Sequence, residues 1–273
     1  MAVFLAGFTA ILGKLIVLNE GLLVWYRLIL SVIILASIDI YKGELKGVRF
    51  RDFFRIARVG LILSFHWVTF YGSVKYSNAS VAVVCLSAAG FFSSILEPMI
   101  LRKKWSSVEV LLGLISVAGI YIIFDFHPQY KTGIVFGILS ALGSAAFPIY
   151  NKRLLEKFTP KTLTLFEFAG GLLLLSCFLP FYFMKFQPVY YWPTAADWCW
   201  LVVLTVFCTV IAFDLQLQSL KKISAFTQNL TYNLEPIYSI ILAFVIFNEN
   251  SLLNAHFYYG LALIIVAILL QMI

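Results

Sequence analysis

Ten long apolar stretches run through the chain, and its basic residues are concentrated on every second connection between them. Fifteen of the twenty Lys and Arg lie on these connections, at residues 42–58, 102–104, 152–161 and 221–222. The intervening connections carry only Lys75, Lys131 and Lys185. About twenty apolar residues suffice to cross a bilayer as a helix, and short loops rich in Lys and Arg normally stay in the cytoplasm. The pattern predicts an all-α membrane protein with ten transmembrane helices and both termini in the cytoplasm.

The composition indicates a membrane protein without a separate soluble domain. Hydrophobic residues make up 62% of the 273 residues and charged residues only 12%, too few to cover a water-soluble globule. The net charge of +7 lies mainly in the predicted cytoplasmic loops, where it orients helices beside anionic lipid. We therefore expect the lipid bilayer of a prokaryotic cell membrane, and not nucleic acid, as the partner of these charges.

Two further sequence features argue against a disulfide or metal framework and against a cleaved signal peptide. The four Cys residues lie inside apolar stretches without C-x-x-C spacing, which argues against a disulfide framework or a metal site, and no cofactor is expected. Met1 is followed directly by an apolar run with no basic segment before it, so we expect the first span to remain as a permanent helix rather than a cleaved signal peptide.

The two halves of the chain show weak internal similarity. Because five spans, an odd number, separate the two copies, the second copy must enter the membrane from the opposite side. We therefore predict two inverted five-helix repeats, residues 1–127 and 128–273, a plan that secondary transporters use for alternating access. A shift of 146 positions aligns Ser73 with Ser219, Lys75 with Lys221, Ala79 with Ala225, Ser93 with Ser239, Ile95 with Ile241, Leu96 with Leu242, and Ile100 with Ile246.

Three segments carry a resemblance to a known family. They read K-Y-S-N-A-S-V-A-V-V-C-L-S-A at 75–88, L-K-K-I-S-A-F-T-Q-N-L-T-Y-N-L-E-P-I-Y at 220–238, and F-N-E-N-S-L-L at 247–253. Together with Gly7, Lys14 and Arg27 in the first two spans, they resemble the EamA-type transporters of the drug/metabolite transporter superfamily. The resemblance implies a ten-helix 5+5 inverted repeat that moves small metabolites, without naming the substrate.

The first half departs from the family pattern at two places. Gly90 stands where the family usually has proline, and Lys103 with Lys104 stands where it has an acidic turn, whereas the second half keeps Pro236 and Glu249. A proline removes a backbone donor and kinks a helix. Pro236 and Gly90 are therefore candidate hinges, and the first half is expected to kink less; a static kink that improves packing is the alternative.

The ninth apolar stretch carries a broad polar flank. In lipid such a flank must face protein or water, so we interpret it as the wall of a substrate-binding cavity; interhelical hydrogen bonding is the alternative. At a rise of 1.5 Å per residue, Glu235 lies about 16 Å into this helix, close to the bilayer midplane. The flank comprises Gln228, Thr231 and Glu235 at i, i+3, i+7 spacing and the neighbouring Asn229, Tyr232, Asn233 and Pro236.

Ionisable and aromatic groups in the earlier spans are further candidates for substrate binding. Lys14 and Arg27 fall in the outer third of consecutive antiparallel helices, where two cations could hold a carboxylate or phosphate; alternatively Lys14 snorkels outward and Arg27 pairs with a carboxylate.

For Glu167, near the cytoplasmic end of the seventh span, we expect snorkelling or pairing with Lys161.

An aromatic, titratable wall is predicted in the third span. It consists of His66, Trp67 and Tyr71, and an unperturbed His changes charge near physiological pH. A structural His with satisfied hydrogen bonds is the alternative. If transport is coupled to protons, Glu235 is the first candidate for the coupling group and His66 the second.

These features favour a secondary transporter of small polar or amphipathic metabolites, such as amino acids, with export as the expected direction. The chain lacks a G-x-x-x-x-G-K-[ST] nucleotide-binding loop, so transport must use a gradient. A facilitative exchanger is the alternative. An intramembrane enzyme is disfavoured because there is no H-E-x-x-H motif and no pair of catalytic carboxylates.

Small residues at Gly133, Gly137 and Ala141 allow close helix packing, within the fold or in a homodimer.

Overall fold

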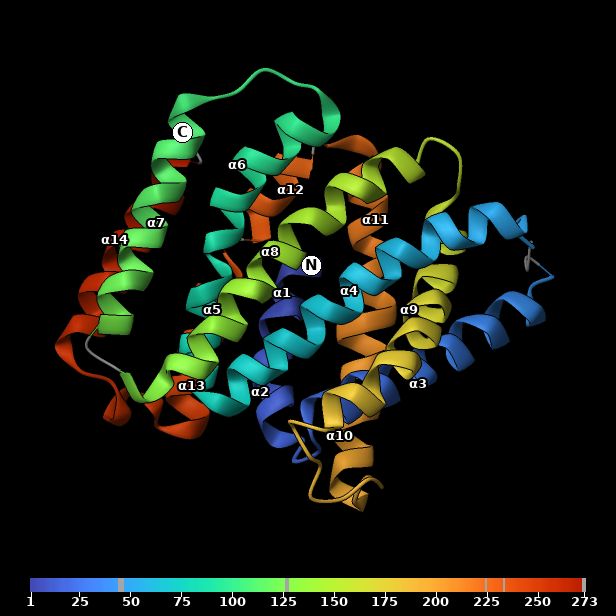
Figure 1. The fold of residues 1–273 in the computed structure, drawn as a ribbon, viewed down its shortest axis with the longest axis horizontal. Coiled ribbons are helices and arrows are strands. Elements are labelled where there is room, and N and C mark those ends of the chain that lie inside the picture. The colour runs from blue at the N-terminus through green and yellow to red at the C-terminus, as the bar shows by residue number, and fades with distance from the viewer. Residues whose placement is uncertain (44–46, 126–127, 224, 233, 272–273) are drawn as a thin grey trace.

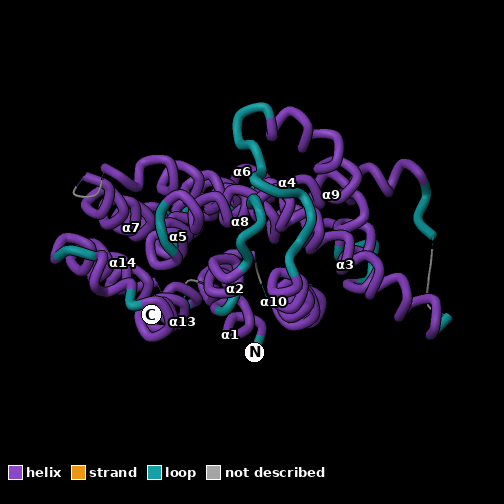
Figure 2. The backbone as a smooth tube through the Cα atoms, turned by 90° about the horizontal axis from the view of Figure 1, so that it is seen from below, coloured by secondary structure: helices purple, strands orange, loops and turns teal. Residues whose placement is uncertain are grey.

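The computed structural model describes the chain except for residues 44–46, 126–127, 224, 233 and 272–273. Within the described residues the secondary structure is helical throughout, without strands (Figure 2). The α-helices are α1 Ala2–Gly7, α2 Thr9–Leu15, α3 Glu20–Tyr41, α4 Phe50–Tyr76, α5 Ala79–Leu86, α6 Ala88–Leu101, α7 Ser107–Asp125, α8 Lys131–Leu154, α9 Pro160–Phe183, α10 Ala195–Thr205, α11 Ala212–Lys222, α12 Ala225–Tyr232, α13 Glu235–Phe247 and α14 Ala255–Gln271. The other helical segments are η1 Pro128–Tyr130 and η3 Glu249–Leu252, both 3-10, and the π-helical η2 Val206–Ile211.

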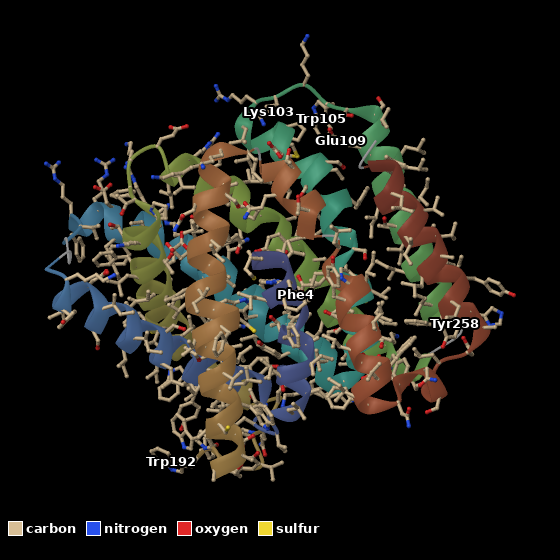
Figure 3. All side chains as sticks on the ribbon, turned by 180° about the vertical axis from the view of Figure 1, so that it is seen from behind. Phe4, Lys103, Trp105, Glu109, Trp192 and Tyr258 are labelled. Atoms are coloured by element: carbon tan, nitrogen blue, oxygen red, sulfur yellow. The ribbon has the colours of Figure 1, made fainter. Side chains whose placement is uncertain are left out.

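Six helical segments are long and apolar enough to cross a membrane. They are Glu20–Tyr41, Phe50–Tyr76, Ala79–Leu101, Lys131–Leu154, Pro160–Phe183 and Ala195–Lys222. Four shorter apolar helices accompany them, at Ala2–Leu15, Ser107–Ile123, Glu235–Phe247 and Ala255–Leu270. The connection around Lys103 and the loop around Trp192 lie at opposite ends of these helices (Figure 3), as the alternation of basic connections predicts.

Polar caps explain where several of these helices begin. The Asn78 side chain accepts a hydrogen bond from the backbone N–H of Val81 at the start of α5. At the start of α10, Thr194 and Asp197 form a capping box, each side chain accepting from the other residue's backbone N–H. Such caps satisfy backbone donors that have no partner inside the helix, and they fix the points at which the chain turns back.

The fourth and ninth apolar stretches are each divided into two helices. The first divides at Ser87, between α5 and α6. The second divides between Tyr232 and Glu235, and Pro236 lies in the first turn of α13, where its missing N–H costs no helical bond. The ninth stretch therefore forms two helices on either side of Asn233, which lies outside the described residues. In the first half of the chain, the fourth stretch is interrupted by the turn at Ser87. Gly90 lies inside α6, three residues after this turn.

The packing interleaves the first and second parts of the chain. Helix α4 packs against α8 and α9, α5 against α13, and α6 against α12. Helices α7 and α14 lie side by side at the edge of the molecule (Figure 1). Their backbones meet at two glycines: a Cβ atom on Gly119 would lie 2.6 Å from the carbonyl oxygen of Gly260. Only glycine permits this approach.

The stripe of small residues on α8 packs within this chain. A Cβ atom on Gly133 would lie 2.6 Å from the Ser77 side chain, and one on Gly137 would lie 2.5 Å from the Cys85 side chain. The stripe therefore packs against α4, α5 and the turn between them in the same molecule.

Candidate functional site

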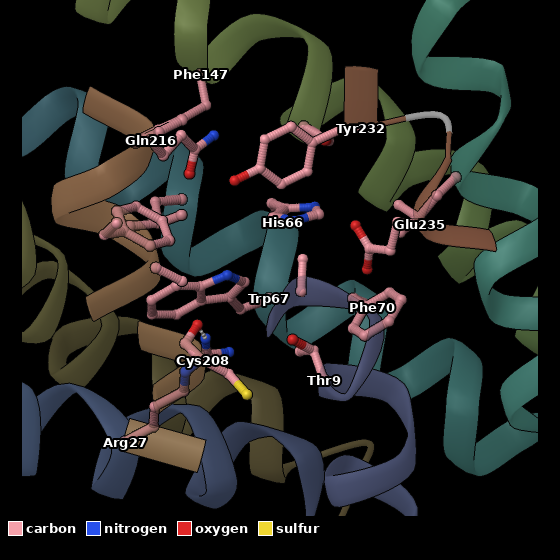
Figure 4. A pocket seen from close by; sticks show the side chains of 16 residues that line it. Thr9, Arg27, His66, Trp67, Phe70, Phe147, Cys208, Gln216, Tyr232 and Glu235 are labelled. Atoms are coloured by element: carbon pink, nitrogen blue, oxygen red, sulfur yellow. Dashed lines mark hydrogen bonds between the residues drawn. The ribbon is translucent and has the colours of Figure 1, made fainter. Parts of the chain in front are cut away.

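A small polar cavity lies between the two parts of the chain, next to the break before α13 (Figure 4). Its volume is about 80 Å³, which is enough for a few water molecules but well below the roughly 300–1,000 Å³ of pockets that enclose a small-molecule ligand. A small-molecule ligand of ordinary size therefore does not fit in this cavity as the structure shows it. Its polar lining comprises Thr9, Arg27, His66, Trp67, Ser144, Gln216, Tyr232 and Glu235.

Arg27 reaches the cavity from α3 and is held in one orientation. Its side chain is only 1% exposed, and its Nε donates to Thr209 Oγ1 at 2.6 Å and its Nη2 to the Cys208 carbonyl at 3.2 Å. Its Nη1 donates to the Tyr71 hydroxyl at 2.8 Å. The guanidinium also lies 3.7 Å from the centre of the Trp67 ring, a favourable cation–π distance.

The π-helical segment η2 supplies two of these contacts. A π-helical turn inserts an extra residue into an α-helix, releases backbone groups from the regular pattern and often occurs at functional sites. Here it directs the Cys208 carbonyl and the Thr209 hydroxyl toward Arg27, while the same hydroxyl donates to the Leu204 carbonyl at 2.9 Å. Three of the five guanidinium N–H donors are used in the hydrogen bonds of the described residues.

Glu235 brings a carboxyl group to the same cavity. It is the first residue of α13 and is 9% exposed, and its carboxylate points into the cavity near Tyr232 and His66 (Figure 4). Within the described part of the chain, the carboxylate has no hydrogen bond and no ion pair with Arg27. Glu235 also lies at the N-terminal end of α13, where the positive end of the helix dipole favours a carboxylate.

His66 lines the cavity from α4 and is anchored on α8. Its Nδ1 lies 2.9 Å from the Ser140 carbonyl oxygen, and the Ser140 hydroxyl donates to the His66 carbonyl at 3.0 Å. Since a carbonyl oxygen can only accept, the Nδ1 carries the proton when this bond forms, and Nε2 is then the free acceptor of the ring. Nδ1 therefore fixes the ring against α8.

The structure brings five predicted residues together and places three others, Lys14, Tyr71 and Gln228, outside the cavity lining. Tyr71 contacts Arg27 instead of lining the cavity. Gln228 is buried and donates from Nε2 to the Gln216 carbonyl at 3.2 Å. The Asn229 side chain and all of Asn233 lie outside the described residues. The five that line the cavity are Arg27, His66, Trp67, Tyr232 and Glu235.

Lys14 does not share a site with Arg27, contrary to expectation. Its Nζ forms an ion pair with Glu249 at 2.6 Å and lies 4.4 Å from the centre of the Phe247 ring. The fully buried Glu249 also accepts from the backbone N–H of Ala79 at 3.0 Å, from that of Ser80 at 2.9 Å, and from the Ser80 hydroxyl at 2.6 Å. This network, the Glu249 link, joins α2 and α5 to the segment after α13.

Glu167 is a second correction. Its side chain neither snorkels to the membrane surface nor pairs with Lys161; it is fully buried next to Asn151, and neither carboxylate oxygen has a hydrogen bond in the described part of the structure. The sequence analysis also missed Thr9, Ser144 and Gln216 in the cavity lining. Single Ser, Thr and Gln residues are common in membrane helices, so these positions carried no signal.

Comparison with known proteins identifies the family. The sequence profile of the EamA-like transporter family matches residues 1–125 and again residues 131–273. The "Uncharacterized transporter YetK" of Bacillus subtilis (strain 168) is 26% identical over 267 residues, which cover 91% of this chain and 78% of that protein. An "Uncharacterized transporter" of Archaeoglobus fulgidus is 22% identical, with 84% of this chain and 92% of that protein covered.

Two further similarities are more limited. An "Uncharacterized transporter" of Haemophilus influenzae is 26% identical over 163 residues, and the match spans 56% of this chain and about half, 53%, of that protein. A solved crystal structure superposes with a TM-score of 0.68 over 98% of this chain and 92% of its own, at 16% identity, which shows similarity of fold alone. With the family profile matching nearly the whole chain, this is a multi-pass membrane protein that belongs to the EamA-like transporter family.

Proposed function

We propose that the protein is a secondary active transporter that moves a small polar or amphipathic metabolite, such as an amino acid, across the cell membrane by alternating access. The central observation is that the Arg27 guanidinium and the Glu235 carboxyl group line one buried cavity and form no ion pair with each other in the described structure. Buried charges are costly unless they are compensated. A ligand that carries both charges would compensate the two groups at once.

The proposed topology has ten spans in two inverted halves, with both termini in the cytoplasm. Support comes from the family profile, which matches residues 1–125 and 131–273 separately, and from the basic connections at one end. The divided helices add to this support, because α12 begins 146 residues after α5, at Ala225 and Ala79, and this is the same shift that aligns the two halves. Paired broken helices at a central site are typical of inverted-repeat transporters.

An amino acid would bind with its carboxylate on Arg27 and its ammonium group on Glu235. The planar guanidinium of Arg27 suits a carboxylate, which accepts two hydrogen bonds side by side. Trp67, Phe70 and Tyr232 line the same cavity and would contact an apolar side chain. Because the cavity is smaller than such a ligand, binding requires the helices to separate at the breaks, which act as hinges.

Coupling to protons would follow from competition at Glu235. The carboxyl group can hold either a proton or the ammonium group of the substrate, since the proton removes the charge that attracts the ammonium group. A proton entering from outside would therefore displace the substrate there, and export would follow. His66 Nε2 is the second candidate for a proton site. A facilitative exchanger would result if Glu235 stayed charged throughout the cycle.

The Glu249 link is proposed to hold the outer end of the cavity closed. Glutamine at position 249 would weaken the bond to Lys14 and to the two amides at the start of α5, because charge-assisted hydrogen bonds are roughly twice as strong as neutral ones. We expect Glu249→Gln to raise the proton leak of proteoliposomes in the absence of substrate, measured with a pH-sensitive dye.

Lys14→Met is the matched comparison for this variant. It removes one bond and leaves the three donors from Ala79 and Ser80 on Glu249, so its leak should be smaller than that of Glu249→Gln. A leak that is larger in Lys14→Met, or no leak in either variant, would contradict the proposed closure.

Transport of a metabolite panel into proteoliposomes tests the proposed function. Amino acids, their amides and their decarboxylated amines should be compared with and without a pH gradient. We expect only compounds with both a carboxylate and an ammonium group to be transported, and a pH gradient to drive their accumulation. Equal transport of the amines would contradict the role of Arg27, and exchange without any effect of the gradient would indicate a facilitative exchanger.

A further inference from the structure

A second charged groove lies at the end of the molecule that carries the basic connections. It has a volume of about 580 Å³ and lies where the end of α3, the start of α9 and the end of α11 meet. These three helices lie together on one side of the molecule, away from α7 and α14 (Figure 1). The groove shares no lining residue with the central cavity. Its charged lining consists of Asp39, Lys161, Asp214, Lys221 and Lys222.

The acidic side of the groove contains an uncompensated carboxylate. Asp39 is 7% exposed and lines the groove. Among the described residues it makes no hydrogen bond through its side chain and no ion pair, including with Lys42 close by in the sequence. Asp214, the second carboxylate of the groove, accepts one hydrogen bond from Gln218 Nε2 at 2.6 Å. The groove therefore presents carboxylate oxygens to a cationic group.

The basic side of the groove is formed by lysines and a helix start. Lys221 and Lys222 are exposed in the last turn of α11, and Lys161 lies in the first turn of α9. The 24-residue helix α9 directs its positive dipole end to the groove. These groups suit a phosphate.

We propose that this groove binds the headgroup of a phospholipid that carries both a phosphate and a primary ammonium group, as phosphatidylethanolamine does. The phosphate would lie on Lys221, Lys222 and the start of α9, and the ammonium group would donate to Asp39 and Asp214. The apolar lining residues Leu165 and Phe166 continue along α9 into the membrane, where they would contact an acyl chain.

The charges distinguish this lipid from others. An anionic headgroup without an amine would satisfy the lysines but would leave the buried Asp39 carboxylate uncompensated. A choline headgroup has a positive charge but no N–H to donate, so it cannot form charge-assisted hydrogen bonds with either carboxylate. Of these headgroups, the one with a primary amine fits both sides of the groove.

Lipid binding to the purified full-length protein tests this proposal, with native mass spectrometry as the readout. We expect phosphatidylethanolamine to bind about tenfold more tightly than phosphatidylcholine of the same acyl chains, the effect of about one charge-assisted hydrogen bond. Asp39→Asn should reduce that preference to near unity. The control, Asp52→Asn, removes a carboxylate that pairs with Arg55 outside the groove, and it should keep the preference.

Additional lipids and a second variant separate the alternatives. Lys221→Gln should weaken binding of phosphatidylethanolamine and phosphatidylglycerol alike, which tests the phosphate side even if Asp39→Asn does not fold. Equal binding of phosphatidylcholine and phosphatidylethanolamine would overturn the proposal, as would tighter binding of phosphatidylglycerol. Glycerophosphoethanolamine, which lacks acyl chains, should bind weakly; binding as tight as that of the lipid would overturn a lipid site in favour of a soluble ligand.

Discussion

Glu235→Gln is expected to abolish accumulation of substrate driven by a pH gradient. Glutamine keeps the size and polarity of the side chain but can neither hold a negative charge nor exchange a proton at neutral pH. The ammonium group of the substrate would lose its partner, and the pH gradient would lose its point of action. Uptake into proteoliposomes with an imposed pH gradient should fall to the level of protein-free liposomes.

The pH dependence of binding gives a second measure of the same role. In the native protein, acidification is expected to protonate the Glu235 carboxyl group and so to weaken substrate binding. Binding of substrate to Glu235→Gln should be weak at every pH at which the native protein shows this change. Asp52→Asn, which removes a partly exposed carboxylate paired with Arg55, should behave like the native protein. Full gradient-driven transport by Glu235→Gln would exclude Glu235 as the coupling group.

Arg27→Lys is expected to lower the apparent affinity for substrate by about tenfold or more, which corresponds to a loss of about 1.4 kcal/mol or more of binding free energy. Lysine preserves the charge but lacks the planar fork that contacts Thr209, the Cys208 carbonyl and Tyr71 and that stacks on Trp67. A flexible ammonium group could not hold the substrate carboxylate in the same orientation. The measurement is the concentration dependence of initial transport rates.

Arg55→Lys is the matched control for this substitution. Arg55 lies on the same helix as Trp67 and Tyr71, but it is partly exposed and pairs only with Asp52 in the described ion pairs, so its replacement should leave the affinity unchanged. If Arg27→Lys transported with native affinity, the guanidinium would serve only to support the packing of η2 against α3 and α4. A decarboxylated substrate analogue should be insensitive to Arg27→Lys, since it lacks the carboxylate.

Much of the helical framework could be predicted from the sequence, because the cost of unpaired backbone groups in lipid leaves few alternatives to helices. The family resemblance, drawn from three short segments, is confirmed. The polar flank of the ninth stretch also led to Tyr232 and Glu235, which the structure places in the central cavity. Glu235 could be predicted because a carboxyl group near the middle of a membrane helix must face protein or water and not lipid.

Other features depend on contacts that no local pattern reveals. Lys14 meets Glu249, a residue 235 positions away, and only the assembled fold brings them together. Helical periodicity placed Gln228 beside Glu235 on one continuous helix. In the structure the two residues lie on separate helices, α12 and α13, and Gln228 contacts Gln216 instead. The π-helical segment η2 has no distinctive sequence. Its carbonyl at Cys208 therefore could not be predicted as a partner of Arg27.

Accessibility of Cys208 from the two sides of the membrane is the most direct test of a central cavity that opens alternately. Cys208 lines this cavity, and replacing the other three cysteines, Cys85, Cys177 and Cys199, with alanine leaves it as the single reporter. A membrane-impermeant thiol reagent should then modify Cys208 from either side of oriented proteoliposomes, and a transported substrate should slow the reaction from both. Modification from one side only, or with no protection by substrate, would contradict alternating access at this site.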